Sequence, residues 1–214
     1  MQRFKSESDG QQHMSDVKDQ VLDEIIAGFD RMRASTIRHA SITFDVFNAA
    51  VREVEGKFVR AHQVAAFAEQ SKRYPAADIE VLWGHYVSAL ASICTDKQSE
   101  ISTEGFAVFP RYVGAYLKSA SLTVIGNVGN SFGHTMRSGK LTLMGNTQWG
   151  VGCGMKGGEI TIHGNAGSGV GDRMDGTGVI RVLGTYESLG NPILGEIYRG
   201  TEKVWPVNYG RRRR

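Results

Sequence analysis

The sequence is short of cysteine, and it has no long hydrophobic run. Its two cysteines, Cys94 and Cys153, lie far apart, which excludes a disulfide framework and the paired spacing of a zinc site. No apolar stretch approaches the ~18 residues that span a bilayer, and residues 1–16 are polar where a signal peptide would be apolar. We therefore expect a cytoplasmic protein with no membrane partner.

Glycine is scarce in the first half of the chain and abundant in the second. Only four of the 27 glycines lie in the first 100 residues, and 23 lie in the remaining 114. Each glycine weakens a helix interior by about 1 kcal/mol relative to alanine, so the second half is not expected to be helical. The 214 residues are therefore predicted to form two parts with different secondary structure.

The formal net charge of +3 is unevenly distributed. Residues 1–100 hold 12 basic and 15 acidic side chains, whereas residues 101–214 hold 13 basic and 7 acidic ones. Four of the latter basic residues form the terminal run from Arg211 to Arg214. No aromatic residues are interleaved with this run, so we interpret residues 206–214 as a solvated basic tail and not as a nucleic-acid site.

Apolar residues in the first half recur with the 3.6-residue spacing of amphipathic helices. The stripes run over residues 17–32, 47–58, 64–67 and 79–93. Short connections between them predict a small antiparallel bundle over residues 14–95. The helical histidines His39, His62 and His85 have no partner three or four residues away, so they do not predict a metal pair.

From residue 121 the sequence repeats with a period of 19 or 20 residues. The units are 121–139, 140–158, 159–178 and a fourth that begins at 179, and each opens with a short alternating strand. Four sets of residues recur in register: Gly126, Gly145, Gly164 and Gly184; Gly133, Gly152 and Gly171; Met136, Met155 and Met174; and Asn127, Asn146 and Asn165.

A strand followed by glycine-rich turns every 20 residues is typical of a β-solenoid. Stacked coils place like residues over like, so the aliphatic and methionine columns should point inward and the asparagines should form a hydrogen-bonded ladder. The predicted fold class is α + β: an N-terminal helical module, a connection or cap over 96–118, and a short right-handed parallel β-helix of about four coils over 119–205.

Two glycine-rich stretches, 150–154 and 167–171, resemble dinucleotide-binding loops when taken alone. Such a loop must be followed by a helix whose N-terminus meets the pyrophosphate. The sequence Met-Asp-Gly-Thr-Gly at 174–178 cannot open a helix, and there is no Walker lysine. We reject nucleotide binding for these loops.

The stretch Val-Gly-Cys-Gly-Met-Lys-Gly-Gly-Glu-Ile at 151–160 resembles the GXGXG family over residues 119–205. That family includes the GXGXG-containing subunit of formylmethanofuran dehydrogenase, its counterpart in bacterial formyltransferase/hydrolase complexes, and the C-terminal domain of glutamate synthase. Gly-Asn-Ala-Gly at 164–167 and Gly-Glu-Ile-Tyr-Arg-Gly at 195–200 look more like the formylmethanofuran dehydrogenase branch. The resemblance implies a right-handed β-helix that acts as a structural subunit.

The resemblance also implies that this chain holds no cofactor. Molybdenum or tungsten pterin, iron–sulfur clusters or FMN would reside only on partner subunits. The first hypothesis is therefore a non-catalytic scaffolding subunit of a multi-subunit oxidoreductase, with a flat β-helix face against a larger catalytic subunit. The alternatives are a glutamate-synthase-type subunit beside flavin and glutaminase components, and a self-associating interaction protein that forms a homo-oligomer.

A hydrolase built on Ser131 and His134 is the remaining alternative, with Asp172 or Asp175 as the acid. In the repeat, however, Ser131 aligns with glycines, and His134 aligns with Cys153 and Asp172. A column of unlike residues is expected at a variable outer corner. We therefore predict no catalytic and no metal-binding residues, and we expect the exposed edge of a coil to tolerate His163.

Overall fold

A computed structural model describes residues 19–35 and 43–206. The chain consists of an N-terminal helical module followed by a parallel β-solenoid, as the sequence predicts. Residues 14–18, His39 and the basic tail from 207 lie outside the described residues. In the described part of the chain, no helix is both long enough and apolar enough to cross a bilayer.

Within the described residues, the helical module contains four α-helices, one short α-helical turn, a 3₁₀ turn and a π-helical turn. They are α2 (Gln20–Ala34), α3 (Thr43–Val54), α4 (Ala61–Gln70), η2 (Ser71–Arg73), α5 (Ala76–Asp78), η3 (Ile79–Trp83) and α6 (Gly84–Ile93). Asp19 caps α2 by accepting a hydrogen bond from the Leu22 N–H at 3.0 Å. Their shared core centres on Phe29, Phe67 and Tyr86, which are fully buried, with ring centroids 5.2–5.4 Å apart.

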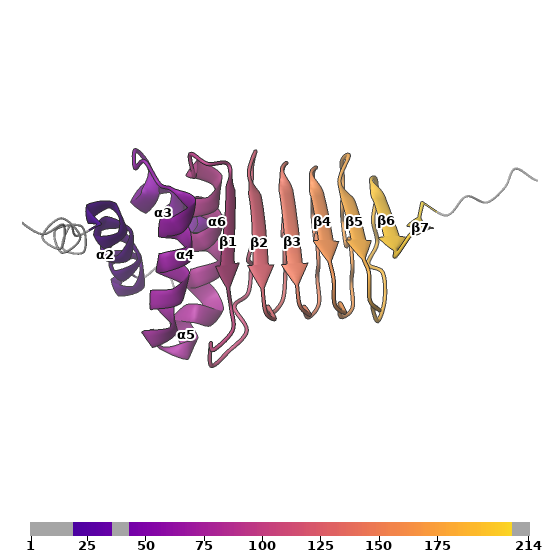
Figure 1. Cartoon of the computed structure of the whole chain (residues 1–214). Helices are drawn as coiled ribbons and strands as arrows, with labels where there is room; N and C mark the ends of the chain where they lie inside the picture. Colours follow the sequence, from indigo (N-terminus) through magenta and orange to yellow (C-terminus); the bar gives the residue numbers. More distant parts are fainter. Residues whose placement is uncertain (1–18, 36–42, 207–214) are drawn as a thin grey trace, which may run out of the picture.

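Seven strands of the described chain form one sheet in sequence order. They are β1 (Gln98–Ser102), β2 (Ser121–Ile125), β3 (Lys140–Met144), β4 (Glu159–Ile162), β5 (Val179–Val182), β6 (Glu196–Arg199) and β7 (Glu202–Trp205). The first five pairings are parallel, and β7 turns back antiparallel on β6. Figure 1 shows the strands in a row that leads away from the helices.

The solenoid begins one coil earlier than the repeat indicates. Residues 96–118, expected as a connection or cap, contain β1, which pairs in register with β2. Two features hide this coil. The step from β1 to β2 is longer than the later steps, and Tyr112 and Tyr116 stand at left-handed positions where Gly150 and Gly154 stand two coils later. The solenoid therefore has about five turns and not four.

The interior is built from repeated apolar columns. Leu122, Leu141, Ile160, Ile180 and Ile197 form the strand column, and Met136, Met155 and Met174 form a second column, all with at most 1% of their surface exposed. A Cβ atom on Gly152 would lie 2.5 Å from Ile180 Cδ1, and one on Gly171 would lie 2.6 Å from Ile197 Cδ1. The glycines therefore let the chain pass close to the strand column.

The asparagines form a ladder along the solenoid axis. The Oδ1 atoms of Asn127, Asn146 and Asn165 each accept a hydrogen bond at 2.8 Å from the backbone N–H one coil further on. Side-chain amides also meet directly at one step, where Asn146 Nδ2 donates to Asn127 Oδ1 at 3.0 Å. The ladder thus supplies acceptors to N–H groups at the strand ends.

The helical module closes the β1 end of the solenoid, where α4 lies next to β1 (Figure 1). Buried residues of the helices and of the solenoid belong to one continuous hydrophobic core. At the junction, the Gly114 N–H donates to Ser88 Oγ of α6 at 2.8 Å, and Phe47 stacks on Tyr116 with 4.9 Å between centroids. The cap therefore covers an apolar strand edge that would otherwise invite aggregation.

Candidate functional site

The outer face of the sheet is a regular surface of the solenoid. In β2 to β5 the residues alternate strictly, so every second side chain is buried and its neighbours point outward. Parallel sheets are normally covered on both faces. Here the inner face packs on the solenoid core, and among the described residues the outward side chains of these strands are partly or fully exposed.

Three rows of side chains run across this face, each with one residue from each strand or from the position directly after it. The row at the start of the strands is Ser121, Lys140, Glu159 and Val179; the middle row is Thr123, Thr142, Thr161 and Arg181; the row at the strand ends is Ile125, Met144, His163 and Leu183. Met144 and Leu183 expose 46% and 47% of their surface. The row at the strand ends is apolar except for His163, and it lies beside three threonines and Arg181, a combination suited to contact with another protein.

Charged side chains gather at the C-terminal end of the face. Arg181 Nε lies 3.5 Å from Glu159 Oε1, and its guanidinium stacks over the Tyr198 ring at 4.1 Å. Hydrogen bonds from Lys203 and then from Tyr198 lower the pKa of Glu196. These residues hold one another in place, so this end of the face is ordered and polar.

The structure does not bring Ser131 and His134 together as a catalytic pair. Ser131 is 3% exposed and takes a left-handed backbone conformation, as Gly150 does in the same column. The His134 N–H bonds to the Ser131 carbonyl at 3.1 Å, whereas His134 Nδ1 is buried and has no hydrogen-bond partner among the described residues. Asp175 pairs with Lys156 at 3.1 Å instead.

Cys153 lies between two charged side chains at the same corner of the solenoid. Its Sγ atom donates to Asp172 Oδ2 at 4.0 Å and accepts from Arg173 Nη2 at 3.9 Å. Burial raises the pKa of the Cys153 thiol, against the opposing effect of Arg173. A protonated thiol is a poor nucleophile, so this geometry favours a structural role.

Two histidines face Tyr112 where the helices meet the solenoid. The His85 ring of α6 stacks on Tyr112 with 4.8 Å between centroids, and the His134 ring contacts Tyr112 edge-on at 5.7 Å. Burial, and then the charge of His134, lower the pKa of His85 to about 3. Burial, and then Arg173, lower the pKa of His134. Both rings are therefore neutral at neutral pH.

The residues that surround these groups were not predicted from the sequence. Arg173 and Tyr112 lie between strands, and neither residue type recurs at the equivalent position of the described coils two steps away. Alignment of the repeat did place His134, Cys153 and Asp172 in one column. The Arg173 side chain contacts two residues of that column, Cys153 and Asp172. Within residues 19–35 and 43–206, no group of three His, Cys, Asp or Glu side chains could hold a metal ion. His163 lies exposed in the apolar row of the sheet face.

Comparisons with known proteins give no relative for this chain. No family model matches it, and no match was found among curated proteins or solved structures.

Proposed function

We propose that this chain is a scaffolding protein that binds another protein through the outer face of its sheet. The observation that carries the proposal is the open face of β2 to β5, where Met144 and Leu183 are half exposed on a parallel sheet. Stacked backbone hydrogen bonds keep this face rigid, so binding would cost little conformational entropy.

The GXGXG resemblance suggests the partner to test first. It is a larger catalytic subunit of an oxidoreductase similar to formylmethanofuran dehydrogenase, and any molybdenum or tungsten pterin, iron–sulfur cluster or FMN would reside on that partner. Such an assembly would operate in the cytoplasm. Flavin and glutaminase subunits of the glutamate-synthase type, or a second copy of this chain, are the alternative partners.

The test is native mass spectrometry of the tagged chain, purified from the cells that naturally produce it. We expect a larger, cofactor-bearing chain with the wild type, and its loss in a Met144→Glu, Leu183→Glu double variant. The matched control is Phe58→Glu, because Phe58 is 81% exposed but belongs to the helical module. A monomer from every preparation would contradict the proposal, and a homo-oligomer disrupted only by the double variant would favour self-association.

A further inference from the structure

The outer sheet face keeps one register over the four strands from β2 to β5. Each pairing aligns residues one to one without a bulge, so the rows of side chains run straight across the face. Neighbouring strands lie about 4.8 Å apart, so equivalent positions on the face are evenly spaced. A regular face of this kind can be matched against a second copy of itself by a two-fold rotation.

The charges at the start of the strands lie on the two central strands. Lys140 begins β3, Glu159 begins β4, and the two residues are direct neighbours in the sheet register. Lys140 is exposed and has no ion-pair partner within residues 19–35 and 43–206. Glu159 has only a neighbour on its own face, with its Oε1 3.5 Å from Arg181 Nε. A two-fold axis parallel to the strands, midway between β3 and β4, brings each lysine opposite the glutamate of the other copy.

The same rotation matches apolar residues at the strand ends. It keeps each row opposite itself and reverses the order of the strands, so β2 faces β5 of the second copy. Ile125 then lies opposite Leu183 of that copy, and Met144 lies opposite its His163. Ile125 also borders a hollow of about 390 Å³ beside α4, which leaves room for the Leu183 side chain. Apolar contact and ion pairs thus occupy opposite ends of the same strands.

Three other two-fold arrangements of this face bring like charges together. An axis along β3 would place Lys140 against Lys140 of the other copy, and an axis along β4 would do the same for Glu159. An axis across the strands, along the middle row, would place Arg181 against Arg181. Like charges directly opposite each other destabilise a contact, so the axis between β3 and β4 is favoured over these three.

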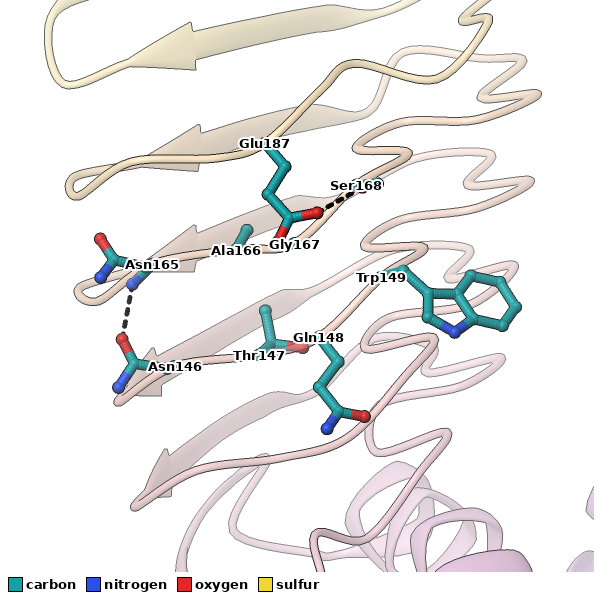
Figure 2. Close-up of a pocket in the computed structure, with 9 residues that line it drawn as sticks. All are labelled: Asn146, Thr147, Gln148, Trp149, Asn165, Ala166, Gly167, Ser168 and Glu187. Carbon is teal, nitrogen blue, oxygen red and sulfur yellow. Dashed lines mark hydrogen bonds between the residues drawn. The ribbon is translucent and has the colours of Figure 1, made fainter.

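Polar groups in the main hollow between coils bond to one another instead. The hollow has a volume of about 460 Å³, and Asn146, Asn165, Ser168 and Glu187 border it (Figure 2). The Asn165 N–H donates to Asn146 Oδ1 at 2.8 Å, and Ser168 Oγ donates to Glu187 Oε2. Unmatched charge therefore points to the sheet face and not to this hollow.

We propose that the outer face of β2 to β5 binds a second copy of this chain in a two-fold symmetric dimer. The proposal rests on the proposed function, because the second copy occupies the face assigned there to a partner. Two ion pairs between Lys140 and Glu159 fix the register, and the row at the strand ends supplies the apolar contact. The four strands give a face of roughly 19 Å by 17 Å. Each partner of a standard interface buries about 800 Å², so we expect a weak dimer that dissociates at micromolar concentration.

The test is sedimentation equilibrium of the full-length protein from low to high micromolar concentration in low-salt buffer. Lys140→Glu and Glu159→Lys should each weaken the dimer at least tenfold, because each places two pairs of like charges across the axis. An equal mixture of the two variants should associate again, because a heterodimer regains two pairs of opposite charge. Glu55→Lys is the matched control, since Glu55 is exposed in the helical module and its reversal leaves the dimer unchanged.

Thermal melting checks that the variants remain folded, and Met144→Glu, which should abolish the dimer, replaces a reversal that unfolds the chain. The dimer is overturned if the wild type stays monomeric at high micromolar concentration, or if the mixture associates no better than either variant alone. A monomer whose captured partner is lost in the Met144→Glu, Leu183→Glu double variant would overturn the dimer and support the proposed function. A monomer that captures no partner would contradict both.

Discussion

The solenoid and the helical module are held together in opposite ways. In the solenoid, one interaction is copied from coil to coil, as in the strand column from Leu122 to Ile197 and the asparagine ladder. In the helical module, each contact occurs once: Tyr86 donates to the Ile25 carbonyl at 2.7 Å, and Arg33 pairs with Asp78 at 2.8 Å.

This difference has an energetic consequence. A repeat protein is stabilised by nearest-neighbour contacts, so damage to one coil weakens its two interfaces and can spread along the stack. A helical bundle distributes stability over many unlike contacts, and one continuous core joins the two parts here. Substitutions at repeated positions and at the junction therefore test whether the two parts unfold as one.

The largest effect is expected from Gly152→Ala, which inserts a methyl group where the coil passes close to the strand column. The new Cβ atom would lie 2.5 Å from Ile180 Cδ1, on a residue with a φ of +61°. Overpacking and left-handed strain together should lower the free energy of unfolding by about 3 kcal/mol. Chemical denaturation followed by circular dichroism measures this loss.

Gly200→Ala is the matched control, because Gly200 has a φ of +58° and no atom within 4 Å of its added Cβ. It carries the backbone strain without the clash, so we expect a loss of about 1 kcal/mol. Equal losses in the two variants would show that the glycine column is needed for its backbone conformation and not for close packing.

The second prediction is that folding stability falls at acid pH because of His85, the histidine at the junction between the helices and the solenoid. Burial, and then the charge of His134, hold its folded pKa at about 3, well below the 6.5 of an exposed histidine. Below pH 6.5 the unfolded chain therefore binds a proton that the folded chain excludes, and stability falls until the pH reaches the folded pKa. We expect a loss of about 2 kcal/mol from this group between about pH 7 and pH 5.

Denaturation of His85→Phe at both pH values isolates this contribution. Phenylalanine keeps the ring stacked on Tyr112 and has no proton to bind, so the variant should lose about 2 kcal/mol less than the wild type. His163→Phe is the control, since His163 is exposed on the sheet face. An unchanged pH dependence in His85→Phe would place the acid-sensitive group elsewhere.

The solenoid was predictable from the sequence because its period is fixed by geometry. Each coil must return to the same strand register, so residues such as Met136, Met155 and Met174 recur at 19-residue steps and all become buried. The first coil was missed where the period lengthens and where Tyr112 and Tyr116 take the glycine conformation. A repeat is visible in a sequence only while its period and its residue types are kept.

The candidate sites were far less predictable, because function uses positions where the repeat varies. Alignment showed that His134, Cys153 and Asp172 share a column, but not that Arg173 would approach the thiol. Trp149, Ser168 and Glu187 line one hollow between coils but share no residue type, so only the folded structure brings them together. The contact between His85 and Tyr112 joins separate parts of the chain and leaves no local pattern.

The smallest predicted effect concerns the acceptor oxygen that the asparagine ladder offers to the next coil. Asn127→Ala removes the acceptor of the Asn146 N–H, which lies at 2.8 Å, and should cost about 1 kcal/mol with faster hydrogen exchange at Asn146. Asn127→Asp keeps an oxygen at that position and should retain slow exchange there. If both variants lose protection equally, an acceptor oxygen at position 127 is not sufficient to protect the Asn146 N–H. If only the alanine variant does, each asparagine acts on the next coil as a helix cap acts on its first turn.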